Sequence, residues 1–290
     1  MPAAGMVRGG GVATRKSVPL PITAPIRKVL GSWPMADTNE RNLIGLGHAD
    51  LDQSIYRIYA LDRFKSLLAA KQDAVVNPTK WDDPFENFFL ERTEVMDGTT
   101  GATIPLRNLS TDWYGQCWSL NADTDAMWRI YSPNPGLKSG VKVRSTIRKL
   151  FNNLKAAGSK VPYLQFFVGR VRYLDEADIT SLMGTLTFAD VMMGGQGNRF
   201  AELLCIKRTA FSHEAEVRLL FRDIDPKRGL SGGFQFHLDA NLVFEDVVLD
   251  PRLEDIHAAG LKAQLKSAGC NLPISRSPLY QSPRYLIPAA

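Results

Sequence analysis

The chain has 290 residues, of which 44% are hydrophobic, 22% charged and 9% aromatic. This composition is typical of a globular protein and excludes disorder throughout the chain. No run approaches the roughly 18 apolar residues of a membrane-spanning helix, so we predict a soluble, cytoplasmic protein without membrane partners. The cysteines, Cys117, Cys205 and Cys270, are far apart and odd in number, which argues against a disulfide framework and favours a reducing compartment.

The net charge of +5 arises in one segment of the chain. Residues 1–36 contain five basic residues and no acidic residue, and the remainder has 30 of each sign. The charge therefore does not indicate a general affinity of the body for phosphate backbones. The segment is rich in glycine and proline, so we predict a flexible basic tail over residues 1–45 and a single catalytic-type domain over residues 46–290. A natural start at Met35 is an alternative explanation of the tail.

From about residue 50 the chain alternates between apolar strands and amphipathic helices. Residues 55–59 have the pattern of a strand, and Leu61, Phe64, Leu67 and Leu68 then recur at helical spacing. We predict further strands at 74–76, 114–119, 141–143, 165–173, 215–221, 234–237 and 243–249, and helices at 124–131, 146–156 and 255–268. The irregular order of these elements favours a mixed α+β fold (mixed α/β sheets with short helices) over a doubly wound sheet or a barrel.

The segment Asp83-Pro84-Phe85-Glu86 has the pattern of a helix N-terminus. It offers an N-cap acceptor, proline at the first helical position and glutamate three residues after the cap. We prefer this capping box as the explanation. The alternative is a carboxylate cluster at a pocket mouth, formed together with Asp82.

Aromatic residues are concentrated between positions 113 and 131. Three of the five tryptophans and two tyrosines lie there, and Met127, Trp128 and Tyr131 share one face of the predicted helix. An aromatic face at this spacing usually belongs to a core. The same density can stack a base or a nicotinamide ring, which makes Trp128 and Tyr131 candidate binding residues.

The segment from His213 to Phe221 is the most informative part of the chain. If it is a strand, its alternation places Glu214, Glu216 and Arg218 on one face and apolar residues on the other. A salt-bridged outer face is one explanation. The other is a site in which one glutamate stabilises a developing cation, the second positions a hydroxyl, and Arg218 holds their charge state.

Five ordered segments between residues 54 and 250 resemble a bacterial family of unknown function whose hallmarks are N-D-P-F-E, C-[FW]-S, M-W-x-x-Y and E-x-E-x-R. This sequence departs from the family at Asp82, where asparagine is usual, and at Phe211, where tryptophan is expected. The matching segments are Tyr56-Arg57, Asp82-Asp83-Pro84-Phe85-Glu86, Gln116-Cys117-Trp118-Ser119, Met127-Trp128-x-x-Tyr131 with Gly140, and Phe211-x-x-Glu214-x-Glu216-x-Arg218.

A more distant similarity is to the ADP-ribosyltransferases of the arginine, serine, glutamate type, because Arg57, Ser119 and Glu214-x-Glu216 occur in that order. The similarity implies that Arg57 binds an NAD phosphate and that Ser119 braces the strand beside the nicotinamide. It further implies that Glu216 bonds the ribose 2-hydroxyl and stabilises the oxocarbenium ion, a chemistry that requires no metal.

Our leading hypothesis is an NAD-consuming enzyme with an ADP-ribosyltransferase-like fold that modifies a macromolecule, as a bacterial toxin or phage-defence effector. Its predicted catalytic residues are Glu216, Glu214 and Arg57, and the predicted NAD-binding residues are Arg57, Ser119, Trp128, Tyr131 and Arg218. One alternative is a metal-dependent nuclease or hydrolase that uses Asp82, Asp83, Glu86, Glu214 and Glu216 as ligands. The other is a nucleic-acid or protein binding module without catalysis.

Overall fold

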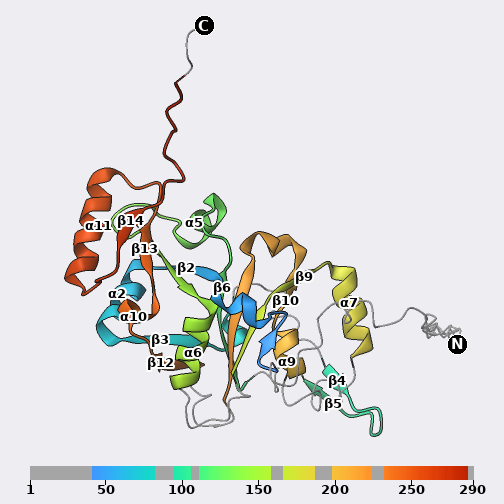
Figure 1. Cartoon of the computed structure of the whole chain (residues 1–290). Coiled ribbons are helices and arrows are strands. Elements are labelled where there is room, and N and C mark those ends of the chain that lie inside the picture. The colour runs from blue at the N-terminus through green and yellow to red at the C-terminus, as the bar shows by residue number, and fades with distance from the viewer. Residues whose placement is uncertain are drawn as a thin grey trace, which may run out of the picture.

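The computed structural model describes residues 41–81, 94–105, 111–157, 166–186, 198–223 and 232–286. Within these residues the centre is a ten-stranded mixed sheet of order β1-β8-β11-β6-β2-β7-β13-β14, from which β3 and β12 branch at β6 (Figure 1). This confirms the predicted α+β class. The strands of the sheet are β1 (Leu43–Ile44), β2 (Ser54–Tyr59), β3 (Gln72–Val76), β6 (Trp113–Ser119), β7 (Val141–Thr146), β8 (Phe166–Arg170), β11 (Glu216–Arg222), β12 (Gly233–His237), β13 (Asp246–Leu249) and β14 (Ile274–Arg276).

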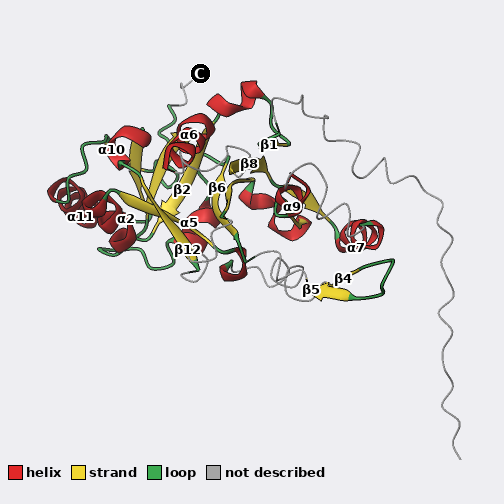
Figure 2. Cartoon of the chain, turned by 90° about the horizontal axis from the view of Figure 1, so that it is seen from below, coloured by secondary structure: helices red, strands yellow, loops and turns green. Residues whose placement is uncertain are grey.

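Helices pack around this sheet (Figures 1 and 2), and two small two-stranded sheets complete the described part. Among the described residues, no helix is long and apolar enough to span a membrane. The helices are α2 (Leu61–Ala70), α5 (Asp125–Tyr131), α6 (Ile147–Ala157), α7 (Glu176–Thr185), α9 (Asn198–Leu203), α10 (Ala240–Val243) and α11 (Asp255–Ser267). The short 3-10 helices are η1 (His48–Asp52), η2 (Pro78–Lys80) and η4 (Thr209–Glu214), and the small strands are β4 (Glu94–Met96), β5 (Thr103–Pro105), β9 (Arg172–Leu174) and β10 (Ile206–Arg208).

The alternation of side chains along β11 separates two hydrophobic cores. Val217, Leu219 and Phe221 join the larger core, to which α2, α6 and α11 also contribute buried residues. Leu220 points to the other face and joins a smaller core with residues of β8 and α9. Because both faces of β11 are covered, the charged residues Glu216 and Arg218 on this strand are buried as well.

Most of the predicted elements are confirmed, including β2, α2, β3, β6, α5, β7, α6, β12 and α11. Two strands were predicted too long. Residues 166–174 form two strands that pair in different sheets, because Val171 between them bonds through its amide to the Glu216 carbonyl oxygen. Residues 240–243 form α10, because Asp239 caps that helix by accepting from the Asn241 amide, so β13 begins only at Asp246.

The sequence pattern missed several elements. Helix α7 buries only Ile179 and Leu182, so its apolar periodicity is weak. Leu43 and Ile44, which we placed in the predicted tail, form β1 and pair with β8. Residues 1–40, the segment Asp82–Glu86 and the glycine-rich residues 194–197 lie outside the described residues.

Candidate functional site

Strands β2 and β6 meet at one end and then diverge. They pair only at Tyr56 and Ser119, whereas the other end of β6 pairs with β3, where Gly115 lies opposite Val76. Strand β6 therefore changes neighbours along its length.

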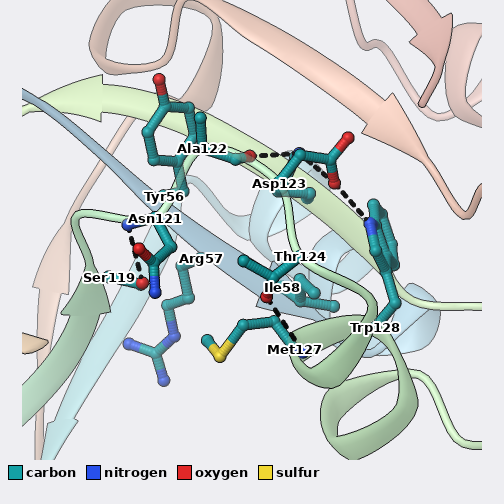
Figure 3. Close-up of a pocket in the computed structure, with 11 residues that line it drawn as sticks. Tyr56, Arg57, Ile58, Ser119, Asn121, Ala122, Asp123, Thr124, Met127 and Trp128 are labelled. Carbon is teal, nitrogen blue, oxygen red and sulfur yellow. Dashed lines mark hydrogen bonds and ion pairs between the residues drawn. The ribbon is translucent and has the colours of Figure 1, made fainter. Parts of the chain in front are cut away.

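A pocket lies beside the paired residues Tyr56 and Ser119, with an empty volume of about 250 Å³ including the solvent at its mouth. Figure 3 shows its walls, which come from β2, the end of β6, the loop that follows β6, the start of α5, and β7. The lining residues are Tyr56, Arg57, Ile58, Ser119, Asn121, Ala122, Asp123, Thr124, Met127, Trp128 and Lys142. Three predicted site residues, Arg57, Ser119 and Trp128, thus share one pocket.

Arg57 is the unusual residue of this pocket. Its side chain is half-buried and lies over the ring of Tyr59, with 5.0 Å between the guanidinium carbon and the ring centre. Its Nη1 atom is buried and has no hydrogen-bond partner among the residues that the structure describes. Figure 3 shows the guanidinium group beside the Met127 side chain and below Ser119. A buried donor without a partner costs free energy, so this nitrogen favours an anionic ligand.

The loop after β6 is fixed by a network around Asp123. Its carboxylate accepts hydrogen bonds from the Trp128 indole at 2.7 Å and from Ser277 Oγ at 2.5 Å, and it pairs with Lys142 Nζ at 2.9 Å. Burial raises the pKa of Asp123, but these three partners outweigh burial and lower it below its usual value. Trp128 is 0% exposed. Its ring therefore has no solvent-exposed face on which a nicotinamide can stack, contrary to the predicted platform.

Glu214 and Glu216 form a buried pair next to the pocket. Glu214 ends η4 and Glu216 begins β11, so the strand predicted at 215–221 is confirmed to within one residue and the alternation considered from His213 holds only from Glu216 onward. Between them Ala215 adopts the left-handed conformation, with φ of 44°. This turn brings the two carboxylates to one ammonium group, since Lys207 Nζ lies 2.5 Å from Glu214 Oε2 and 2.6 Å from Glu216 Oε1.

The two carboxyl groups have different proton affinities. Burial, together with the proximity of Glu216, raises the pKa of Glu214 to about 7. Burial would also raise the pKa of Glu216, but Arg218, Glu214 and Lys207 outweigh it and hold that pKa well below its usual value. Near neutral pH the pair therefore has one permanently ionised carboxylate, Glu216, and one carboxyl that takes up a proton readily.

Arg218 and Tyr131 contact this pair rather than the pocket. Arg218 is 1% exposed, bonds Glu216 Oε2 through Nε at 2.7 Å, and stacks over Trp81 at 4.4 Å. It thus favours the ionised form of Glu216, but it is too enclosed to bind a phosphate. Tyr131 is 42% exposed, and its hydroxyl lies 3.5 Å from Glu214 Oε1, at the outer limit of a hydrogen bond.

Ser119 connects the pocket to the glutamate pair. It lies directly opposite Glu216 in the antiparallel register of β6 and β11, so both side chains are on the same face of the sheet. Its hydroxyl donates to the Glu214 carbonyl oxygen at 2.6 Å and accepts from the Asn121 amide at 3.0 Å. The serine therefore joins the end of β6 to Glu214 and to the loop at Asn121, and its implied role beside the nicotinamide stays a prediction.

Sequence reasoning missed Lys207, which lies in β10 next to other basic and apolar residues and belongs to no motif. The metal-site alternative requires a cluster of ligands. Among the described residues, no group of three or more His, Cys, Asp or Glu side chains is suited to hold a metal ion. Both described glutamates of that alternative are already bound by Lys207. Asp82, Asp83 and Glu86 lie outside the described residues.

Comparison with protein-family models finds no match, and comparison with curated proteins finds none either. The expected family of unknown function therefore stays a prediction. Solved structures of DarT from Thermus sp. 2.9 match at 11% identity over 78% of this chain. They contain NAD+ (TM-score 0.36, 96% of that chain covered), ADP-ribosylated ssDNA (0.37, 94%) and carba-NAD+ (0.33, 95%). The likeness is distant.

Proposed function

We propose that the protein is an NAD-consuming, ADP-ribosyltransferase-like enzyme that modifies a macromolecule. The observation that carries this proposal is the convergence of Arg57 and Ser119 in one pocket, with Glu216 directly opposite Ser119 on the neighbouring strand. These three residues come from β2, β6 and β11, which are far apart in the sequence. Arg57 and Ser119 line the pocket itself, whereas Glu216 does not line it and adjoins it through Ser119.

Arg57 is proposed to bind a phosphate of NAD. Its buried, unpartnered Nη1 supplies a charge-assisted hydrogen bond to an anion that enters the pocket. The enclosed volume of the pocket is about 20 Å³, far below the roughly 300–1,000 Å³ of sites that enclose a whole small molecule. The pocket therefore does not enclose a dinucleotide in this structure, and the phosphate beside Arg57 is the part of NAD that its charge selects.

Glu216 is proposed to act where positive charge develops on the ribose. In this reaction the bond between ribose C1′ and the nicotinamide nitrogen breaks, and nicotinamide leaves with the electron pair. The acceptor then forms a bond to C1′ and loses a proton. A fixed carboxylate stabilises the intervening oxocarbenium ion. Each oxygen of Glu216 accepts one bond from a cationic side chain and keeps a lone pair for a ribose hydroxyl.

The proposal is tested by measuring nicotinamide release from NAD in the presence of protein, RNA and DNA targets. We expect Glu216→Gln to reduce kcat by about 10²-fold or more, because the amide removes the negative charge that faces the cation. We expect Arg57→Met to act mainly on KM for NAD, because it removes a ground-state contact to phosphate.

The controls are Glu254→Gln and Arg148→Met, which remove the same charges on the exposed surface. Both control proteins are expected to release nicotinamide at the wild-type rate. If the wild-type protein releases no nicotinamide with any target, the proposal is wrong. If the protein releases nicotinamide, we further propose that it acts as a bacterial toxin or phage-defence effector.

A further inference from the structure

We propose that Lys207 is the positioning residue of the glutamate pair, and that its ammonium group fixes the Glu216 carboxylate in its reactive orientation. This inference rests on the proposed function for its catalytic meaning, but its structural content can be measured without turnover. Lys207 comes from β10, outside the central sheet, and none of the motifs in the sequence includes it.

The contacts of Lys207 suit this role. Its side chain is 7% exposed, and its ammonium lies 2.5 Å from Glu214 Oε2 and 2.6 Å from Glu216 Oε1. The ring of Phe211 closes a further side, with 4.7 Å between the ammonium nitrogen and the ring centre. The lysine is therefore held by charged and aromatic partners from η4 and β11, and its position is closely defined.

The backbone between the glutamates explains why a cation is needed here. The left-handed conformation of Ala215 turns both carboxyl groups toward the same buried volume. Two ionised carboxylates at such a place repel each other strongly, and each loses hydration energy on burial. Lys207 offsets both costs by bonding one oxygen of each, so the turn and the lysine stabilise each other.

The other groups near this centre do not replace Lys207. Arg218 bonds the second oxygen of Glu216 and does not bridge to Glu214 in any described hydrogen bond. The Tyr173 hydroxyl accepts from the Glu216 amide at 2.8 Å, and the Tyr131 hydroxyl lies 3.5 Å from Glu214. The titratable and charged groups that face the pair are Lys207, Arg218, Tyr131, Tyr173 and, beside Tyr131, Cys117.

Lys207→Met is the decisive variant, Lys207→Arg tests whether the charge suffices, and the exposed Lys149→Met is the matched control. In Lys207→Met, we expect kcat for nicotinamide release to fall about 10²-fold, as for a reacting group displaced by about 1 Å. KM for NAD should stay within about threefold, because Arg57 still binds the phosphate. Lys207→Arg should recover most of the lost rate, and Lys149→Met should match the wild type.

The readout independent of turnover is the titration of the Glu216 carboxyl carbon by NMR, assigned with Glu216→Gln. In Lys207→Met its midpoint should move to higher pH by about one unit or more, and the low-pH limb of the rate profile should move with it. An unchanged Glu216 midpoint in Lys207→Met overturns the inference.

If Lys207→Met does not fold, Lys207→Gln takes its place, because it also removes the charge and keeps a polar side chain. An unchanged Glu216 midpoint in Lys207→Gln overturns the inference, and a midpoint that moves to higher pH supports it. If the wild-type protein releases no nicotinamide while the Glu216 midpoint depends on Lys207, the proposed function fails and the positioning contact stands.

Discussion

Ala215 determines the geometry of the glutamate pair at the scale of single residues. A non-glycine residue in the left-handed region is uncommon and costs roughly 1–2 kcal/mol, so it persists only where its surroundings fix it. Here the Ala215 amide donates to the Ser212 carbonyl oxygen at 3.2 Å, and the Leu120 amide donates to the Ala215 carbonyl oxygen at 2.9 Å. The strained turn is thus held by η4 on one side and by the end of β6 on the other.

The raised pKa of Glu214 predicts a stability that depends on pH. A glutamate whose folded pKa is about 7 stabilises the fold fully below its unfolded value, and this contribution is lost as pH rises through 7. Glu214→Gln keeps the neutral form at all pH values. We therefore expect it to match the wild type near pH 5 and to exceed it at pH 9 by on the order of 1–3 kcal/mol of unfolding free energy.

Urea denaturation at the two pH values measures this difference, with the exposed Glu254→Gln as the control. A difference between Glu214→Gln and the wild type that is the same at both pH values would contradict the assignment. Glu216 contributes with the opposite sign, because its pKa is lowered and its stabilising effect is lost as pH falls below the unfolded value.

At the scale of elements, the C-terminal segment after β14 fixes α5. Helix α5 has seven residues, too few to be stable alone. Ser277 bonds Asp123 just before the helix, the Tyr280 hydroxyl donates to the Asp125 carboxylate, and Arg129 bonds the same hydroxyl at 3.1 Å. The pocket wall formed by α5 therefore depends on residues about 150 positions away.

Ser277→Ala tests this dependence. We expect it to reduce the unfolding free energy by about 1.5–3 kcal/mol, because it removes a hydrogen bond to a charged carboxylate. It should also raise KM for NAD, since the loop that carries Asn121 to Thr124 loses a constraint. The control is Ser275→Ala, two residues earlier in β14 and exposed. Equal effects of the two substitutions on stability and KM would refute the role of the segment.

At the scale of the whole molecule, a buried polar network connects β2, β3 and β6 in the part of the sheet where β2 and β6 diverge. Asp73 on β3 is 1% exposed and accepts from the Tyr59 hydroxyl on β2 and from Gln116 Nε2 on β6, both at 2.7 Å. The Trp118 indole donates to Gln116 Oε1 at 2.7 Å. These bonds connect β2, β3 and β6. Buried polar networks whose hydrogen bonds are all satisfied specify one arrangement of the strands.

At the scale of the whole chain, we predict how the removal of residues 1–36 affects nicotinamide release. Every described residue of the proposed site lies between positions 56 and 218, and the chain without this segment has equal numbers of basic and acidic residues. We expect the shortened protein to release nicotinamide at a rate within about twofold of the full chain. The alternative of a nucleic-acid binding module makes a different prediction. In that case the full chain binds nucleic acid with a steep dependence on salt, and the shortened protein loses most of this binding. Binding of labelled oligonucleotides at two salt concentrations distinguishes these outcomes.

Local patterns in the sequence predicted the elements of the site well. The pattern of residues 55–59 identified β2, and the spacing of Met127, Trp128 and Tyr131 identified α5. They failed at Ala215, because backbone strain depends on contacts from η4 and β6 and leaves no periodic signal. They also failed at Lys207, because its partners are set by strand β10, whose three residues have too little pattern to be recognised.

The sequence by itself determined the mixed class of the fold, the main strands and helices, and the acidic segment that contains Glu216. These features depend on periodicity and residue chemistry, which are local. Arg57 and Ser119 became candidate site residues through the resemblance to the ADP-ribosyltransferases. Only the tertiary structure decided that Arg57 and Ser119 share a pocket, that Trp128 is buried, and that Lys207 bridges the two glutamates. These facts depend on which strands pair and where they diverge, and strand order is a property of long-range packing that no local pattern encodes.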